Sequence, residues 1–525
     1  MLDLDLIRRQ ATATLRLTRD LPAFARAPID YDAARVLVRH RVEARDATFL
    51  HLVERTVFSR PSTPYARLFR AAGCTAGDLR MLVQRDGLES ALERLLAAGI
   101  YATQAELKGR VDIVRGSLRF RAYAHEFDNP LIAPHFEVPT SGSTGRQLFV
   151  GRALAMFAEI GDALAVVIRT FDLERPAYFK WSTLPHSVIE NIRTGMPIVA
   201  WYNPLAVPLP VRLLQVWFWA VARASGVQIA FPRDLPLTHP ERTVHRLASA
   251  LRRHGSVMVD ATSSSATRAA AYAAERGISL QGALWIPWGE PLTRTRENII
   301  RSSGARTTPV YSTVETGPIA MACGRRLDVD AMHVRNEQCA LLRIASQHTH
   351  AAAPPGALMV TSLRPTLAKI LVNAFTGDMA DPLGGLCGCE MDGAGLTQRI
   401  VNVRSFEKLT GEGITLVGTD LARLIEEDLP ATLGGRFGDY QLVETEDPTG
   451  AVRLTLRIAP AAGAVDAAAA RRRLIDSLST VSEDTAHMAR LLEATAAIQI
   501  ERARPWTTNS GKIPPFVPLR AQKAD

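Results

Sequence analysis

The spacing of apolar residues divides the chain into a helical first part and a mixed second part. Residues 79–99 place apolar side chains three and four positions apart with polar side chains between them, which predicts helix. We expect residues 1–130 to be mostly helical. From residue 131 the pattern changes to short apolar runs that are separated by Gly, Pro and Ser and alternate with helical stretches. This alternation predicts an α/β core over residues 131–403.

Individual runs mark the expected elements of the core. Buried strands are predicted at 198–202, 227–230 and 283–286, and helices at 241–254 and 262–276. The pattern restarts after residue 404 in a smaller unit. Two strands joined by the DPTG turn and then one amphipathic helix are expected there, at 440–445, 452–458 and 465–478. The sequence therefore predicts a large α/β N-terminal domain with several subdomains, followed by a small α+β domain over residues 404–525.

The composition is that of a globular protein in a reducing compartment. The 525 residues are 47% hydrophobic and 22% charged and include five cysteines, which excludes a disordered chain and a disulfide-stapled scaffold. The first residues lack the basic-then-apolar layout of an export signal, so we expect a cytoplasmic protein. The most apolar stretch, Leu213–Ala222, is about half as long as a membrane span and lies between arginines. No membrane association is expected.

The positive charge does not indicate nucleic-acid binding. Lys and Arg total 62 against 53 Asp and Glu, a net charge of +9, but only six of these basic residues are lysines. The arginines are spread along the chain, and no basic segment is interleaved with aromatic residues as single-strand binding requires. We expect a small phosphate compound as the anionic partner.

A loop of hydroxyl residues and glycines is the first candidate site. It is Thr140, Ser141, Gly142, Ser143, Thr144 and Gly145, between two strand-like runs. The glycines allow positive φ and turn backbone N–H groups inward, and the hydroxyls add donors, so the loop suits phosphate oxygens. It is not a Walker A loop because no Gly-Lys-Ser/Thr follows. Taken alone, it is equally typical of an exposed Ser/Gly hairpin.

Four later turns carry further chemistry. Gly289, Glu290 and Pro291 follow a predicted strand. Tyr311 can stack on a purine, and Glu315, four residues later, can bind Mg²⁺ beside phosphates. Asp378 in a Thr-Gly-Asp turn can accept two ribose hydroxyls, and Lys512 in a Ser-Gly-Lys turn can neutralise a phosphate. Each segment taken alone is typical of an ordinary turn.

The five segments in this order resemble the adenylate-forming superfamily of acyl-CoA synthetases, peptide-synthetase adenylation domains and luciferases. The resemblance spans residues 136–517, and its pieces are TSGSTG, GEPL, Y-x-x-x-E, TGD and SGK. Within the superfamily the chain is most similar to the phenylacetate–CoA ligase branch. The resemblance implies a large adenylating domain and a mobile C-terminal lid over residues 404–525.

The resemblance also implies a role for each motif residue. The Thr140–Gly145 loop would wrap the β- and γ-phosphates of ATP, and Lys512 would be the catalytic lysine. Gly289, Glu290 and Pro291 would border the adenine. Tyr311 would stack on the adenine, and Glu315 would bind Mg²⁺. Asp378 would hold the ribose. Arg404 would lie at the domain junction and Glu407 at the hinge.

Several positions depart from the family pattern. Val314 stands where Thr or Ser usually precedes the glutamate, with Thr313 and Thr316 as candidates to replace the lost hydroxyl. Trp288 replaces a small residue and would narrow the space beside the adenine. Val403 stands where glycine usually precedes the junction arginine.

Cysteines and one histidine form a candidate structural zinc site. Cys323, His333, Cys387 and Cys389 give C-x9-H and C-x-C, and three thiolates with one imidazole suit tetrahedral zinc. The alternative is that these are reduced core cysteines. Cys339 is a possible substitute ligand for zinc, and Cys74 is expected in the core.

Residues 217–219 are expected to be helix core. Trp181 and His186 are open candidates for the acid site, and His348 and His350 are expected in loops.

The expected function is ATP-dependent adenylation of a small, aryl or short acyl, carboxylate with release of pyrophosphate and transfer to coenzyme A. Alternatives are transfer to a carrier-protein thiol or an amine, and activation of nitrite to diazotise an aromatic amine. A nucleotide-binding or zinc-dependent interaction protein without catalysis is disfavoured because Glu315, Asp378 and Lys512 are all present.

Overall fold

The computed structural model describes most of the chain. The described residues are 4–139, 149–182, 186–204, 206–236, 239–344, 355–405, 408–411, 414–417, 424–436, 438–446, 452–481, 489, 492–493, 497–506 and 516–517. Five of the sequence predictions lie outside them: the Thr140–Gly145 loop, Glu407, Lys512, His348 and His350.

The first part of the chain is helical, as the periodicity predicts. The helices are α1 (Leu4–Ala25), α2 (Tyr31–Glu43), α3 (Arg45–Val53), α4 (Pro64–Ala71), α5 (Ala76–Asp86), α6 (Leu88–Ala97) and α7 (Gln104–Leu107). The stretch 79–99 is divided between α5 and α6, because Gly87 adopts φ of 80° and ends α5. The helical spacing of this stretch is confirmed in both halves. A short hairpin of β1 (Ile113–Arg115) and β2 (Leu118–Phe120) follows.

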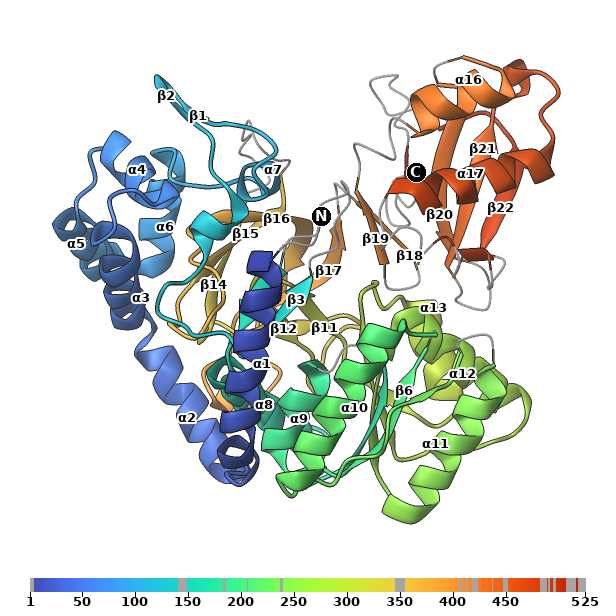
Figure 1. The fold of residues 1–525 in the computed structure, drawn as a ribbon, viewed down its shortest axis with the longest axis horizontal. Helices are drawn as coiled ribbons and strands as arrows, with labels where there is room; N and C mark the ends of the chain where they lie inside the picture. The colour runs from blue at the N-terminus through green and yellow to red at the C-terminus, as the bar shows by residue number, and fades with distance from the viewer. Residues whose placement is uncertain are drawn as a thin grey trace.

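A six-stranded parallel sheet forms the lower part of the molecule in Figure 1. Its order is β10-β9-β8-β5-β6-β7. The strands are β5 (Ala177–Trp181), β6 (Ile198–Asn203), β7 (Arg233–Asp234), β8 (Val257–Thr262), β9 (Ala283–Trp288) and β10 (Arg306–Thr307). The connecting helices are α9 (His186–Thr194), α10 (Leu209–Ala224), α11 (Pro240–His254), α12 (Ser263–Glu275) and α13 (Arg294–Ser302). The alternating strands and helices confirm the predicted α/β core.

The predicted strand at 227–230 is the exception. Only Ile229 pairs, in a single bridge to Ile198. The ladder resumes at β7, after Pro232, which has no N–H to donate to a neighbouring strand. The run of four residues at 227–230 was therefore too short to predict a strand.

A second sheet of seven strands is antiparallel in all its described pairings. Its order is β11-β12-β13-β17-β16-β15-β14. The strands are β11 (Val310–Thr313), β12 (Gly317–Met321), β13 (Met332–Val334), β14 (Cys339–Arg343), β15 (Ala357–Ser362), β16 (Ala374–Pro382) and β17 (Arg399–Ser405), with α14 (Glu390–Gly393) before β17. Helix α8 (Leu154–Arg169), which follows the hairpin β3 (Phe136–Pro139) and β4 (Phe149–Arg152), lies in one hydrophobic core with residues of both sheets, including Tyr178 and Met321. This shared core holds the ends of β9 and β11 next to each other.

The last part of the chain forms a separate small unit, drawn orange and red in Figure 1. The hairpin β18 (Lys408–Gly411) and β19 (Ile414–Val417) precedes it. Its sheet has the order β22-β21-β20-β23, from β20 (Tyr440–Glu446), β21 (Val452–Ile458), β22 (Ile498–Arg502) and β23 (Phe516–Val517). Helices α16 (Leu429–Leu433) and α17 (Ala467–Val481) pack with this sheet in a core of their own. The predicted antiparallel hairpin and following helix are present. Among the described residues, no helix is long and apolar enough to cross a membrane.

Candidate active site and metal centre

One cavity of about 240 Å³ brings together the motif residues that the structure describes. It lies where the end of β9, β11 with the β11–β12 turn, the middle of β16 and the end of β17 meet. The motif residues that line it are Gly289, Glu290, Pro291, Tyr311, Glu315, Asp378 and Arg404. These residues are far apart in sequence, so their convergence is a property of the fold. The role of each residue stays a prediction.

Tyr311 and Asp378 are joined across the cavity wall. The Tyr311 hydroxyl donates to Oδ2 of Asp378 at 2.9 Å, and the Tyr311 ring is 8% exposed. Burial and the neighbouring Asp378 charge raise the pKa of Tyr311 well above its usual value, so the hydroxyl remains a donor. The bond fixes the tyrosine ring, and Thr376 accepts from the Asp378 backbone N–H at 3.2 Å. The pair therefore presents one oriented ring face and one oriented carboxylate.

Glu290 contributes backbone rather than charge to the cavity. Its carboxylate is fully buried and pairs with the guanidinium of Arg296 at 2.9 Å. Ser264 donates to the same oxygen at 2.6 Å, and Ser263 donates to the Glu290 carbonyl at 2.9 Å. This buried network holds the Gly289–Pro291 turn in place, which suits a border to a flat base and leaves no carboxylate there to bind metal.

Glu315 is available as a ligand. Among the described residues its carboxylate has no hydrogen bond or ion pair, and it lines the cavity. Of the two candidates to replace the hydroxyl lost at Val314, Thr313 lines the cavity, whereas Thr316 is fully buried behind it and exchanges a hydrogen bond with Thr313 at 2.8 Å. A carboxylate oxygen beside a hydroxyl is a donor set that fits Mg²⁺.

Two polar lining residues come from the helical first part, outside the motifs. Gln104 and Lys108, from α7 and the residue after it, reach the same cavity from the helical first part. Lys108 also lines a smaller neighbouring cavity together with Glu315. The scarcity of lysine in the chain was the one sequence signal that could have singled out Lys108.

A buried charged cluster lies beyond Trp288, at the carboxyl ends of β5, β8 and β9. Lys180 is fully buried and lies 3.6 Å from Oδ2 of Asp260. Ser182 donates to that oxygen at 2.9 Å, and the Trp288 indole N–H donates to Oδ1 at 2.5 Å. Burial lowers the pKa of Lys180 to about 8, although the Asp260 charge opposes this. Trp288 is therefore held in place by a hydrogen bond to a buried carboxylate.

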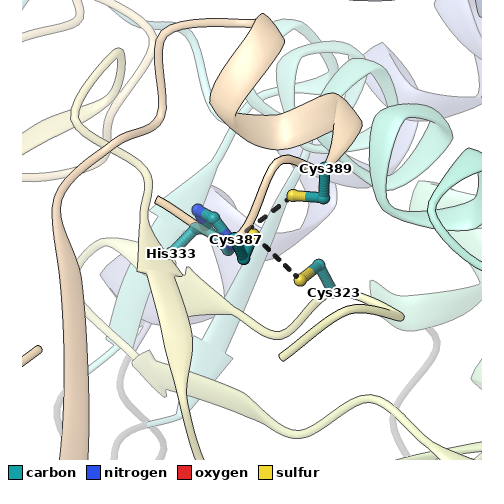
Figure 2. Close-up of side chains that lie close together, drawn as sticks. All are labelled: Cys323, His333, Cys387 and Cys389. Carbon is teal, nitrogen blue, oxygen red and sulfur yellow. Dashed lines mark hydrogen bonds between the residues drawn. The ribbon is translucent and has the colours of Figure 1, made fainter. Parts of the chain in front are cut away.

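The four residues predicted to bind zinc converge on one point (Figure 2). Cys323 follows β12, His333 lies in β13, and Cys387 and Cys389 precede α14. Their ligand atoms all lie within 4.8 Å of one another, and none of the cysteines is in a disulfide. Cys339, the substitute ligand, is buried in β14 and its thiol faces the Arg335 carbonyl, outside the cluster.

The spacing of these atoms fits tetrahedral zinc. With Zn–S bonds of about 2.3 Å and a Zn–N bond of about 2.0 Å, tetrahedral angles place sulfurs about 3.8 Å apart and sulfur and nitrogen about 3.5 Å apart. The sulfurs of Cys323 and Cys387 are 3.7 Å apart. His333 Nε2 lies 3.4 Å from the Cys387 sulfur and 3.5 Å from the Cys389 sulfur. The cluster could therefore hold one zinc ion.

Neighbouring groups orient these ligands. His333 Nδ1 lies 2.6 Å from the Leu396 carbonyl, so Nδ1 carries the proton and Nε2 faces the sulfurs. The Asp392 carboxylate accepts from the backbone N–H groups of Cys387 and Gly388 at 2.8 and 2.7 Å. A hydrogen bond from Cys323 lowers the pKa of the Cys389 thiol to about 3, so one thiolate is already favoured.

The aromatic predictions have mixed outcomes. Phe218 is buried in the core as expected, and Trp217 and Trp219 pack against that core while remaining half-buried. Trp181 is buried, and its indole N–H donates to the Leu235 carbonyl at 2.9 Å. His186 begins α9, but its side chain lies outside the described residues.

Comparison with known proteins establishes the fold. No protein-family profile and no curated protein matches the sequence. The structure is similar to a 2-hydroxyisobutyryl-CoA ligase in complex with 2-HIB-AMP and CoA, with a TM-score of 0.54 and 14% identity over 95% of this chain and 93% of that chain. The fold is therefore that of a CoA ligase. This likeness confirms the predicted fold class.

Two further solved structures score lower. An amide bond synthetase from Marinactinospora thermotolerans has a TM-score of 0.43 and 14% identity over 90% of this chain and 93% of that chain. A malonyl-CoA ligase in a ternary product complex with methylmalonyl-CoA and AMP has a TM-score of 0.41 and 16% identity over 84% of this chain and 94% of that chain. The phenylacetate–CoA ligase branch stays a prediction.

Proposed function

We propose that the protein is an adenylate-forming ligase, which joins a small acid to the α-phosphate of ATP with release of pyrophosphate and then passes the activated acid to an acceptor. The observation that carries the proposal is the convergence of the described motif residues on one cavity. The CoA-ligase fold supports it.

Each described residue has a definite task in this proposal. The Tyr311 ring stacks on the adenine, and the Gly289–Pro291 backbone borders its edge. Asp378, oriented by Tyr311, accepts hydrogen bonds from the ribose hydroxyls. Glu315, with Thr313 beside it, holds Mg²⁺, which would offset the charge that builds on the phosphates. Arg404 lines the same cavity, near the end of β17, where the chain continues toward the small C-terminal unit.

The residues outside the described ranges complete the proposal from sequence alone. The Thr140–Gly145 loop would hold the β- and γ-phosphates, and Lys512 would neutralise the α-phosphate during attack. Residues 404–525 would act as a lid that turns about Arg404 and Glu407 between the two half-reactions. The acceptor would be coenzyme A, an amine or a carrier-protein thiol. We propose a structural role for zinc, because four protein ligands leave no open position.

A second candidate function is activation of nitrite to diazotise an aromatic amine. The observation that favours it is the buried polar cluster of Lys180, Asp260 and Trp288 beside the cavity. A polar cluster in this place would suit a small anion better than a long apolar acid. We rank the small carboxylate first because the departures at Val314 and Trp288 change the edges of the site and leave the charged Glu315 and Asp378 at the cavity.

One screen tests both candidates. Pyrophosphate release is measured with MgATP over a panel of aryl acids, short acyl acids, fatty acids and nitrite, each with and without coenzyme A and an aromatic amine. Release with one or more small carboxylates supports the first candidate. Release with nitrite alone supports the second, and release with no acid in the panel contradicts both.

A further inference from the structure

The helical first part of the chain supplies a lysine to the wall of the proposed active site. Gln104 and Lys108 both line the cavity of about 240 Å³. Gln104 is the first residue of α7, and Lys108 is the residue that ends this helix. Residues four positions apart on a helix lie on the same face, one turn from each other. One face of α7 therefore borders the cavity.

Hydrogen bonds hold α7 against β16, the strand that carries the Thr-Gly-Asp motif. The Gln104 side-chain N–H donates to the Thr376 carbonyl at 2.6 Å. Just before the helix, the Ala102 carbonyl accepts from the Phe375 backbone N–H at 2.9 Å. The backbone at Lys108 is therefore positioned by the large domain, and its place does not depend on the small C-terminal unit.

Lys108 and Glu315 lie close together. Both line the larger cavity, and both also line the neighbouring cavity of about 20 Å³. A cavity of this size has room for about one water molecule, so the residues around it are separated by little more than that. The fold thus brings a lysine next to the carboxylate that is proposed to hold Mg²⁺.

The charges around the larger cavity give this lysine a purpose. Several acidic residues line the cavity, among them Glu315, Asp330 and Asp378. Phosphates beside these carboxylates are repelled unless positive charge lies close to them. Among the described residues, the basic ones that line the cavity are Lys108 and Arg404. Arg404 lies 3.6 Å from the Asp381 carboxylate, on the β16–β17 side of the cavity.

Strand β11 shows at which end of a bound nucleotide Lys108 lies. Tyr311 is proposed to stack on the base, and β11 continues for two residues to Thr313, a rise of about 7 Å. Glu315 follows in the turn after the strand. The base and Glu315 are therefore at different ends of the cavity, and Lys108 shares the end of Glu315.

We propose that Lys108 binds a phosphate oxygen of the nucleotide at the Glu315 end of the cavity. The inference rests on the proposed adenylation, which it deepens by assigning phosphate binding to a residue outside the five motifs. A lysine ammonium carries three donors on a flexible four-carbon chain, so it can reach a phosphate from the edge of the cavity. Because Lys108 belongs to the large domain, it contributes to ATP binding itself, whereas Lys512 is expected to act on the rate of adenylation.

The test removes the charge of Lys108 and varies the number of phosphates. Titration calorimetry with Mg²⁺ and adenosine, AMP, ADP or ATP is carried out on the wild type and on Lys108→Met, which keeps the length of the side chain. Lys108→Met is expected to weaken ATP binding about 10- to 150-fold and to leave adenosine binding within twofold, because only the phosphate loses a charged donor. The shortest nucleotide that loses affinity identifies the phosphate that Lys108 binds.

Matched variants separate this effect from changes in folding or in overall charge. Lys108→Arg keeps the positive charge and should retain most of the ATP affinity. Lys108→Gln should reproduce the loss and serves if Lys108→Met does not melt cooperatively. Arg119→Ala removes one positive charge from an exposed position on β2, where Arg119 pairs with Asp112 at 3.3 Å, and should bind ATP as the wild type does.

The possible results assign failure to one proposal or the other. If Lys108→Met loses affinity for ATP but not for adenosine while no acid releases pyrophosphate, the inference holds and only the adenylation proposal fails. If the wild type forms adenylate and Lys108→Met has the same ATP KM and the same affinity for all four ligands, only the inference fails. Equal losses for adenosine and ATP would also overturn it, and a wild type that binds none of the four would contradict both proposals.

Discussion

The Tyr311–Asp378 pair gives the sharpest test of how the cavity binds a nucleotide. Asp378 lines the cavity with one carboxylate oxygen occupied by the Tyr311 hydroxyl at 2.9 Å. If the other oxygen holds the ribose, Asp378→Ala removes a charged acceptor from the two ribose hydroxyls. The expected result is weaker ATP binding with little change in the melting temperature, because Asp378 lies at the edge of the cavity rather than in the core.

The size of the effect follows from the kind of bond. A hydrogen bond to a charged group contributes about 1.5–3 kcal/mol, which corresponds to a rise of roughly 10- to 150-fold in the ATP KM. Asp378→Asn keeps the shape and an oxygen for Tyr311 but removes the charge, so its KM should rise less, by about 3- to 10-fold. Tyr311→Phe keeps the ring and removes only the orienting hydroxyl, and it should change the KM by less than Asp378→Ala does.

Deoxynucleotides identify which atoms Asp378 recognises. The wild type should prefer ATP over 2′-deoxy-ATP and 3′-deoxy-ATP by about tenfold or more, and Asp378→Ala should lose this preference because the acceptor is gone. Pyrophosphate release with each nucleotide is the assay. An Asp378→Ala variant that keeps both the wild-type ATP KM and the wild-type preference would refute the assignment and leave the Thr-Gly-Asp turn as a structural element.

Three further outcomes are expected. Lys512→Ala should lower adenylate formation by on the order of 10²–10³-fold while ATP binding by calorimetry is retained, and near-wild-type pyrophosphate release would contradict its role. Protein purified without chelators should contain about one zinc per chain by elemental analysis, and Cys387→Ser with Cys389→Ser should lose the zinc and lower the melting temperature before activity changes. Burial holds the pKa of Glu190 at about 7 against an ordinary 4.5, so the folded chain keeps a proton that the unfolded chain has lost in this range. The free energy of unfolding contributed by Glu190 should therefore fall as pH rises from 4.5 to 7, and Glu190→Gln should melt higher than the wild type at pH 8 but not at pH 4.

The sequence predicted those elements whose signal is local and repeated. Helices α11 and α12 and strands β6, β9 and β21 were predicted within a few residues, because each combines a clear period with flanking turn residues. The clearest error is the strand predicted at 227–230, where only Ile229 pairs and Pro232 precedes the resumed ladder. The period of 79–99 did not show where Gly87 separates α5 from α6. Which strands adjoin in the two sheets was not accessible, since pairing depends on contacts between distant segments.

The same distinction applies to the candidate site. Gly289, Tyr311 and Asp378 could be found because each belongs to a short motif with an unusual local composition, although Tyr311 lies in β11 and Asp378 in β16 rather than on turns. The candidate zinc ligands could be found from residue type and spacing, and the structure brings all four together. Lys108 carried no motif, and only the position of α7 beside the cavity shows its place.

The Val314 backbone connects the cavity to a buried guanidinium. Val314 and Glu315 line the cavity, and the Val314 carbonyl accepts a hydrogen bond from Arg152 at 2.8 Å. The Arg152 charge also acts on Glu315. Substitution of Arg152 should therefore disturb the proposed Mg²⁺ ligand through its backbone as well as through its charge.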